Sequence, residues 1–300
     1  MFETIELFGE KVDIKNNCCV KKGKKPQKAY MKLNLYIKLT DMCNANCSVC
    51  SNRGNEKVSN LDYNKLKFVI ETLDKKNLIN RIGITGGEPF LDMDSLNKTL
   101  NAIFEVKPDA FVTINTNGFN INECLKLDRI NDIYGIHISR HHYLDEVNNE
   151  FFGIPVASKN DIMNVMKNAS NDELIRLNCL LMKSYINNSE EVEKYLEMAG
   201  MLGVFRCGFV SLMPINEESI KEFIDFNEVF KNTSDRFLKT KEQNDLDICE
   251  CMNGLYIARN GNLVEYYARM TKELNCPYAR QFVYTSDNHL TVGFNKKPLL

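Results

Sequence analysis

Residues 41–50 of the chain read Asp-Met-Cys-Asn-Ala-Asn-Cys-Ser-Val-Cys, which places Cys43, Cys47 and Cys50 at the spacing C-x₃-C-x₂-C. The stretch directly follows residues 33–39, where apolar and polar side chains alternate as in a half-buried strand. A short loop after a strand can turn three thiols toward one point. Thiolates bind soft metals and iron–sulfur clusters, and three of them leave one coordination position open. A zinc knot or three unrelated thiols are the alternatives.

The composition is that of a globular protein. The chain has 300 residues, of which 44% are hydrophobic, so it can form one large domain or one domain with a small appendage. The net charge of −2 gives no overall attraction to nucleic acid or to an anionic membrane. Because we find neither a membrane-length apolar stretch nor a signal peptide, we expect a cytoplasmic protein. Eleven cysteines in that compartment favour metal or redox chemistry over disulfides.

Strand-like and helix-like segments alternate along the chain. Helices are expected from near Asn60, near Ser158 and after Asn188, where Glu191 completes a capping-box pattern. Such alternation implies parallel strands joined by right-handed crossovers. We therefore predict an α/β fold, a partial (β/α)₆ TIM-like barrel. Its six strands are expected at residues 33–39, 81–85, 110–115, 133–140, 174–182 and 204–214.

Distinctive motifs fall where the predicted strands end. Residues 86–89, Gly-Gly-Glu-Pro, follow the second strand, residues 116–118, Thr-Asn-Gly, follow the third, and Ser139 and Arg140 end the fourth. Loops at this end of a barrel build the functional site. The glycines allow a ligand to approach the backbone, and the Glu88 carboxylate can accept hydrogen bonds from a protonated amino group. A surface turn is the alternative for this tetrapeptide.

The cysteine loop and the Gly-Gly-Glu-Pro motif, in this order, resemble the radical S-adenosylmethionine (radical SAM) superfamily over about residues 32–215. The resemblance implies that Cys43, Cys47 and Cys50 hold a 4Fe–4S cluster, whose open iron chelates SAM. It also implies that an electron from a flavodoxin- or ferredoxin-type reductant cleaves SAM to methionine and a 5′-deoxyadenosyl radical. That radical would take a hydrogen atom from the substrate.

The resemblance further assigns SAM contacts, position by position. Val49 matches a residue that packs near the adenine, and Gly86, Gly87 and Glu88 match the binders of the methionine amino group. Four more polar residues resemble contacts to SAM: Asn115 and Asn117 on the third strand, Ser139 on the fourth and Asn178 on the fifth.

The loop after the fourth strand, residues 140–146, places a cation, two imidazoles, a phenol and carboxylates at the expected mouth of the barrel. Such groups can orient a polar substrate or move a proton. Arg140, His141 and His142 are therefore the candidate catalytic residues. Surface or supporting positions are the alternative for each histidine.

The chain is expected to divide into residues 1–30, an N-terminal hairpin and linker, residues 31–215, the barrel, and residues 216–300, a small α+β cap. The hairpin should turn at Gly9–Glu10. In the cap, the apolar residues between 220 and 230 predict an amphipathic helix, and Asn260–Gly261 predicts a second hairpin.

The cap resembles the Twitch or SPASM extensions of some radical SAM enzymes, in which a cysteine-flanked hairpin holds an auxiliary iron–sulfur cluster. Here the spacing before the hairpin is C-x-C, and no cysteine stands just after it. We predict a degenerate extension that keeps the hairpin without its cluster. An auxiliary cluster at Cys249, Cys251 and Cys276 is the alternative.

The predicted substrate is a small polar metabolite or a nucleotide. Epimerisation or cross-linking of a ribosomally made peptide is the close alternative, but 30 residues before the barrel are too few for a peptide-recognition domain. The near-neutral charge argues against a nucleic-acid substrate. A third hypothesis is a non-catalytic iron–sulfur or zinc protein, against which Gly86, Gly87 and Glu88 argue.

Overall fold

The computed structural model describes residues 2–15, 33–50, 52, 60–229, 237–239, 254–258, 261–267, 281–293 and 298–300. The alternative auxiliary-cluster ligands Cys249, Cys251 and Cys276 lie outside these residues.

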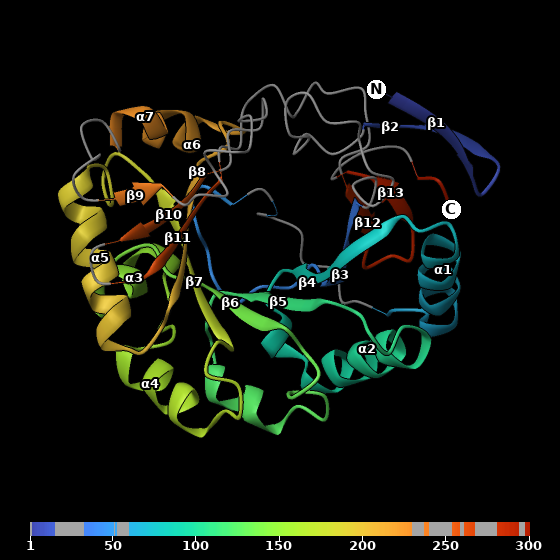
Figure 1. Ribbon diagram of the computed structural model, residues 1–300, viewed down its shortest axis with the longest axis horizontal. Helices are drawn as coiled ribbons and strands as arrows, with labels where there is room; N and C mark the ends of the chain where they lie inside the picture. The colour runs from blue at the N-terminus through green and yellow to red at the C-terminus, as the bar shows by residue number, and fades with distance from the viewer. Residues whose placement is uncertain are drawn as a thin grey trace.

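A curved sheet organises the described part of the chain, and its order is β13-β12-β3-β4-β5-β6-β7-β8-β11-β10-β9. The six central strands, all parallel to their neighbours, confirm the predicted α/β fold. Figure 1 shows the sheet bent into an open horseshoe with the helices outside it, as expected of a partial barrel. The central strands are β3 (Leu33–Thr40), β4 (Ile79–Gly86), β5 (Val112–Thr116), β6 (Gly135–Ser139), β7 (Ile175–Leu181) and β8 (Arg206–Ser211).

The described C-terminal strands extend both edges of this sheet. Strand β11 adds in parallel to β8, and β12 adds in parallel to β3. The predicted hairpin across Asn260–Gly261 is confirmed, since β10 and β11 pair antiparallel. These strands therefore continue the barrel wall, while the domain boundary at residue 215 stays a prediction. They are β9 (Phe237–Lys239), β10 (Gly254–Ala258), β11 (Leu263–Tyr267), β12 (Gln281–Tyr284) and β13 (Leu290–Val292).

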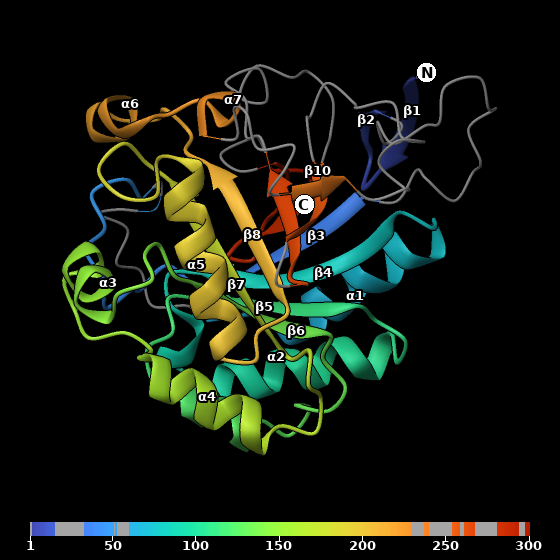
Figure 2. The same cartoon turned by 60° about the vertical axis from the view of Figure 1, so that its left-hand side comes forward.

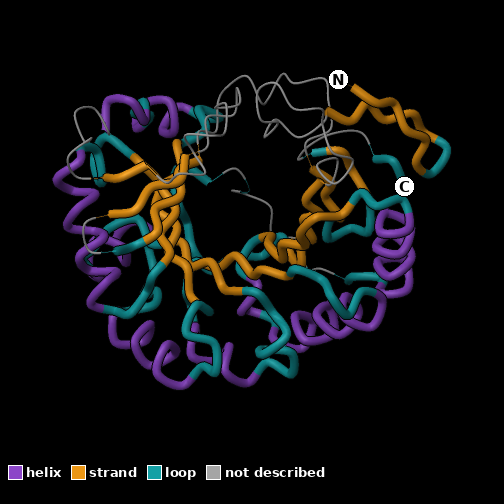
Figure 3. Tube along the Cα trace, viewed as in Figure 1, coloured by secondary structure: helices purple, strands orange, loops and turns teal. Residues whose placement is uncertain are grey.

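The outer layer consists of helices packed on one face of the sheet (Figure 3). Helix α5 (Ser189–Met201) lies alongside β8 (Figure 2). The ring centroids of Tyr195 on α5 and Phe209 on β8 are 5.4 Å apart in an edge-to-face arrangement. Alternate strand residues such as Leu35, Ile114 and Leu177 are fully buried in this core, so the residues between them face the concave side of the sheet. The other main helices are α1 (Tyr63–Lys75), α2 (Met93–Val106) and α4 (Lys159–Asn168).

Several local expectations need correction. Helix α1 is capped by Asp62, whose side chain accepts from Lys65 N, rather than by Asn60. The third strand–helix unit contains a short 3₁₀ helix, η3 (Ile121–Lys126), in place of an α-helix. The last two residues of the loop expected at residues 140–146 instead begin helix α3 (Asp145–Phe152). In contrast, the helix start expected near Ser158 is confirmed, and Ser158 forms a capping box with Asp161 there. Asn188 caps α5 as expected, but the Glu191 side chain pairs with Lys194 instead of completing the expected capping box.

The amphipathic helix expected across residues 220–230 is instead two short helices, α6 (Glu217–Glu222) and α7 (Phe226–Val229). Phe223 ends α6 in an extended conformation, and the side chain of Ile220 is 59% exposed. The apolar spacing alone therefore overestimated the length of this helix. Within the described residues, no helix combines the length and the hydrophobicity needed to span a bilayer.

The N-terminal hairpin is confirmed, with β1 (Phe2–Leu7) and β2 (Glu10–Lys15) pairing antiparallel. Its turn is at Phe8 and Gly9, one residue earlier than expected, and both have positive φ, as a two-residue hairpin turn requires. Leu7 and Ile14 are buried, and the ring of Phe8 contacts that of Phe68 on α1. The hairpin therefore packs on the outer helical layer.

Candidate active site

The cysteine loop begins where β3 ends and is joined there to the Gly-Gly-Glu segment that follows β4. The N–H of Gly87 donates to the carbonyl of Thr40 at 2.7 Å, and the N–H of Glu88 donates to the carbonyl of Met42 at 2.8 Å. The backbone pairing of β3 and β4 is thereby carried past the strand ends. As a result, the two predicted motifs lie in direct contact.

Two glycines make this close contact sterically feasible. Gly86 has φ of +135°, and a Cβ there would lie 2.2 Å from the carbonyl oxygen of Thr40. A Cβ at Gly87 would lie 1.8 Å from the carbonyl oxygen of Met42. Both obstacles are backbone atoms, so the site requires glycine at both positions. These glycines therefore allow the backbone of the cysteine loop to pack directly against the Gly-Gly-Glu segment.

Glu88 does not present an open carboxylate, contrary to our expectation of a direct hydrogen bond to an amino group. Its side chain is fully buried and accepts hydrogen bonds from Phe90 N at 3.0 Å, Thr116 Oγ1 at 2.7 Å and Asn117 N at 2.7 Å. Burial raises the pKa of Glu88 to about 7, although these three hydrogen bonds lower it. Glu88 therefore links the end of β4 to the end of β5 through its hydrogen bonds.

Asn117 extends this hydrogen-bonded link to the first cysteine. Its Nδ2 lies 3.0 Å from Asn44 Oδ1 and 3.9 Å from Cys43 Sγ, and its Oδ1 accepts from Phe119 N at 2.8 Å. Asn115, by contrast, donates to the carbonyl of Ile84 on the neighbouring strand. Only Asn117 of these two asparagines reaches the cysteine loop through a hydrogen bond given by the structure.

Three more segments at this end of the barrel hold the cysteine loop. Asn46 N donates to the carbonyl of Phe152 at the end of α3. Asn216 Nδ2, after β8, donates to the carbonyl of Ser48 at 3.1 Å. Ser286 Oγ, after β12, donates to Asp41 Oδ2 at 2.6 Å. The loop is therefore fixed by segments from around the whole mouth of the barrel.

The thiols lie at the surface of this mouth. Cys43 is exposed, Cys47 and Cys50 are half-buried, and none of them is in a disulfide. Cys43 Sγ accepts from Ala45 N at 3.4 Å, and Cys50 Sγ accepts from Asn52 N at 3.3 Å. Burial raises the pKa of Cys43, while the Ala45 N–H lowers it. Backbone donors of this kind stabilise cluster-bound sulfur, so the donor set fits an iron–sulfur cluster.

In the described part of the chain, no three His, Cys, Asp or Glu side chains converge as they would around a single metal ion. The thiolates that hold a cubane bond to different iron atoms and need not converge in this way.

An apolar patch adjoins the third cysteine. Val49, Met182 and Leu212 are buried together, apart from the main core. Phe151, Leu180 and Tyr185 pack against them. Val49 is itself buried, so the accessible part of this patch is formed by the half-buried Phe151, Leu180 and Tyr185. The contact of Val49 with an adenine ring stays a prediction.

Polar residues line the concave side of the sheet below the mouth. Ser139 and Asn178 are register partners on β6 and β7, and His137 and Arg176 form the next pair toward the amino ends of these strands. Arg176 Nε donates to Asn178 Oδ1 at 3.0 Å. A Cβ at Gly208 would lie within 2.5 Å of both side chains, so this glycine makes room for them.

His137 and Arg176 were missed by the sequence analysis. The period of two along each strand predicts them, because His137 shares a face with Ser139 and Arg176 shares a face with Asn178.

Arg140 is not placed for catalysis. Its side chain is 2% exposed, and its guanidinium donates to Asp145 Oδ1 at 2.6 Å, the carbonyl of Ala157 at 3.1 Å and that of Tyr143 at 3.3 Å. These bonds join the end of β6 to α3 and α4. The expected catalytic role is therefore corrected to a structural one, since Arg140 lies on the helical side of the sheet.

The two histidines also belong to this supporting network. His141 is buried and packs against the rings of Phe151 and Phe152, which also contact each other. Its Nδ1 accepts from Leu180 N, and burial lowers its pKa to about 3. His142 is half-buried, and its Nδ1 accepts from Leu144 N. His141 is thus neutral at physiological pH, which argues against a proton-transfer role.

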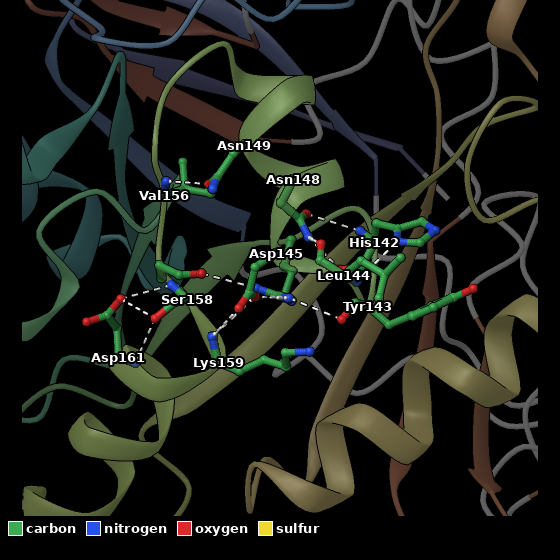
Figure 4. A network of polar contacts seen from close by, with 12 residues as sticks. His142, Tyr143, Leu144, Asp145, Asn148, Asn149, Val156, Ser158, Lys159 and Asp161 are labelled. Atoms are coloured by element: carbon green, nitrogen blue, oxygen red, sulfur yellow. Dashed lines mark hydrogen bonds and ion pairs between the residues drawn. The ribbon is translucent and has the colours of Figure 1, made fainter.

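Asn148, which the sequence analysis did not single out, organises the same loop (Figure 4). Its buried Oδ1 accepts from the N–H groups of His141 and His142, and its Nδ2 donates to the carbonyls of His142 and Leu144. One carboxamide therefore satisfies four backbone groups.

With this geometry in view, the comparisons identify the class of protein. Residues 37–226, more than half of the chain, match the sequence model of the radical SAM superfamily. The chain therefore belongs to the radical SAM superfamily, and membership implies a 4Fe–4S cluster and SAM as cofactors.

The particular relatives are similar to the chain at low identity. A probable GTP 3′,8-cyclase of Saccharolobus islandicus (strain L.S.2.15 / Lassen #1) is 27% identical over 203 residues, which cover 65% of this chain and 63% of that protein. A probable GTP 3′,8-cyclase of Pyrobaculum aerophilum is 24% identical over 184 residues, covering 59% of this chain and 56% of that protein. The chain thus spans less than two thirds of the length of these relatives.

Solved structures support the fold. Streptococcus suis SuiB bound to S-adenosylmethionine aligns with a TM-score of 0.60 and 14% identity, covering 89% of this chain and 63% of SuiB. Native anSMEcpe with bound AdoMet and the Cp18Cys peptide aligns with a TM-score of 0.58 and 15% identity, covering 88% of this chain and 74% of that chain. At such identities the likeness establishes the shared partial-barrel fold.

Proposed function

We propose that this chain cleaves SAM reductively at a cluster held by Cys43, Cys47 and Cys50 and abstracts hydrogen from a small polar metabolite or nucleotide. The observation that carries the proposal is the seating of the cysteine loop on the Gly86–Glu88 segment above a polar concave face. When bound, the cluster supplies the single electron that splits the sulfonium of SAM.

The residues of the chain have distinct parts in this proposal. The carbonyls at the Gly-Gly-Glu segment and the side chain of Asn117 flank the cysteine loop, where the methionine end of SAM would bind. The half-buried side chains that pack against Val49 and its neighbours, Phe151, Leu180 and Tyr185, offer an apolar surface for the adenine ring. Ser139 and Asn178 lie on the concave face and supply polar groups for the ribose. A reductant of the flavodoxin or ferredoxin type would supply the electron.

The substrate would lie deeper on the concave face, near His137, Asn115 and Arg176. These side chains offer hydrogen-bond donors and acceptors and suit a polar molecule. Similarity to probable GTP 3′,8-cyclases supports a nucleotide within this class. Modification of a ribosomally made peptide is the alternative, because SuiB and anSMEcpe, which share the fold, have both been solved with a bound peptide.

The first experiment tests SAM cleavage. The chain is reconstituted anaerobically with iron and sulfide, reduced with dithionite and given SAM, and 5′-deoxyadenosine is quantified. We expect the product from the native chain and none from Cys47→Ala. Cys124→Ala is the matched control, because Cys124 is a buried cysteine in the core outside the loop and its removal should leave the product yield unchanged. Saturation of the thiols by zinc without any SAM cleavage would refute the proposal.

The second experiment tests the substrate class. Purine and pyrimidine nucleotides and short peptides are added in turn, and stimulation of 5′-deoxyadenosine formation is measured. Stimulation by a nucleotide supports the proposed class. Stimulation by peptides alone would favour the alternative.

A further inference from the structure

The turn that joins β12 to β13, residues 285–289, lies beside the cysteine loop, at the end of the sheet where the parallel strands have their carboxyl ends. This follows from topology, because β12 pairs in parallel with β3 and therefore ends beside it. The turn is closed by Thr285 N donating to the carbonyl of His289 at 2.8 Å and by Asn288 N donating to that of Thr285 at 2.9 Å. Asn288 has φ of +65° within this turn.

One side of the turn holds the chain just before the first cysteine. Ser286 is buried, and its Oγ donates to Asp41 Oδ2 at 2.6 Å. Asp41 also pairs with Lys38 Nζ at 2.5 Å, so its carboxylate is held from both sides.

The other side of the turn holds residues 60–62, directly before helix α1. Asn288 Oδ1 accepts from Asp62 N at 2.7 Å, and its Nδ2 donates to the carbonyl of Asn60 at 2.8 Å. The buried Tyr284 hydroxyl donates to Asn288 Oδ1 at 3.1 Å and lies 3.4 Å from the carbonyl of Asp62. The Asn288 carboxamide therefore bridges two backbone groups that directly precede helix α1.

We propose that this turn is a clasp that holds both ends of the cysteine-bearing stretch, with Ser286 and Asn288 as positioning residues for the cluster ligands. Fixing both ends of a loop removes conformational freedom that ligand binding would otherwise have to remove. The C-terminal strands would thereby serve the cluster loop without supplying a ligand to it. The inference rests on the proposed function only where it concerns iron.

The first test uses the metal-free chain and hydrogen exchange of the amides in residues 43–50. Asn288→Gly keeps the left-handed backbone and removes the carboxamide, and Ser286→Ala removes the link to Asp41. We expect exchange in the double variant to be at least about 10-fold faster, because tenfold corresponds to about 1.4 kcal/mol, the net contribution of about one hydrogen bond, and the double variant removes more than one. Asn288→Asp should have a smaller effect, because it keeps the acceptor for Asp62 N.

The matched control is Asn120→Gly. Asn120 is also a left-handed asparagine, with φ of +50°, but its side chain makes no capping bond and it is exposed. The Asn120→Gly variant should leave the amide exchange of residues 43–50 unchanged. The comparison distinguishes the effect of losing the carboxamide from the effect of placing glycine at a left-handed position. If Ser286→Ala and Asn288→Gly, singly and together, exchange like the native chain in this region, the clasp is refuted.

The second test measures iron retention after anaerobic reconstitution. The time for a chelator to remove half of the iron should shorten about 10-fold in the double variant, comparable to the loss of outer-shell hydrogen bonds at other metal sites. Unchanged iron retention together with unchanged exchange overturns the inference. Faster exchange in a chain whose native form takes up no iron would support the clasp and refute the proposed function instead. Circular dichroism verifies that each variant is folded.

Discussion

The carboxylate of Glu88 accepts a hydrogen bond from the backbone N–H of Asn117, with 2.7 Å between Oε2 and N. This bond joins the end of β4 to the end of β5 directly beneath the cysteine loop. Because Asn117 in turn reaches Cys43, a fully buried carboxylate is connected to the first cysteine through one residue.

Glu88 makes the stability of the metal-free chain depend on pH. Burial raises its pKa from 4.5 to about 7, so between these values the folded state holds a proton that the unfolded chain releases. The contribution to the free energy of unfolding is therefore full below about pH 4.5 and is lost as the pH rises through 7. At about 1.4 kcal/mol per tenfold change in proton affinity, about 2 kcal/mol is lost between pH 5.5 and 8.

Urea unfolding of the native chain and of Glu88→Gln at both pH values measures this effect. Glutamine cannot ionise, so the stability difference between the two chains should change with pH by that amount. A difference that stays constant across the range would contradict the assignment.

Gly87→Ala should prevent the two motifs from docking. The added Cβ would lie 1.8 Å from the Met42 carbonyl oxygen, and backbone cannot yield without breaking the bonds to Thr40 and Met42. We expect a loss of about 3 kcal/mol of unfolding free energy together with loss of iron binding. Gly153→Ala is the control, since Gly153 has φ of +69° but open space around its Cβ, and it should cost about 1 kcal/mol without loss of iron.

Arg140→Met should reduce stability rather than catalysis. It removes the guanidinium from Asp145, Ala157 and Tyr143 and leaves a partly buried carboxylate without its cation. We expect the free energy of unfolding to fall by about 2 kcal/mol, less than for a fully buried pair, because Asp145 is partly exposed. At a temperature where the variant is folded, 5′-deoxyadenosine formation per bound cluster should match that of the native chain. A selective loss of SAM cleavage at unchanged stability would restore Arg140 as a catalytic candidate.

Asn148→Leu should disrupt the loop after β6. The substitution keeps the volume but removes the side-chain partner of four backbone groups, in one buried and three partly buried hydrogen bonds. We expect a cost of about 4 kcal/mol, measured by urea unfolding. Asn149→Leu removes a single bond, that from Val156 N, and should cost about 1 kcal/mol. Equal effects of the two variants would show that the four-bond arrangement is not what stabilises the loop.

The sequence by itself determined the parallel strands and the two motifs at their ends. Strand alternation is local in origin, because side chains on successive residues point to opposite faces, and Cys43 and Gly87 are recognisable by spacing alone. The same alternation would also have identified His137 and Arg176 as neighbours of Ser139 and Asn178 on the concave face.

Only the tertiary structure decided how the polar residues are used. Glu88, Arg140 and His141 carry reactive groups in the sequence, but burial and hydrogen-bond partners commit all three to holding strand ends and loops together. The contact between Ser286 and Asp41 joins residues 245 positions apart and has no local signature. The parallel pairing of β12 with β3 creates that contact. The carboxyl ends of two strands that are distant in the chain come together only after the sheet has formed.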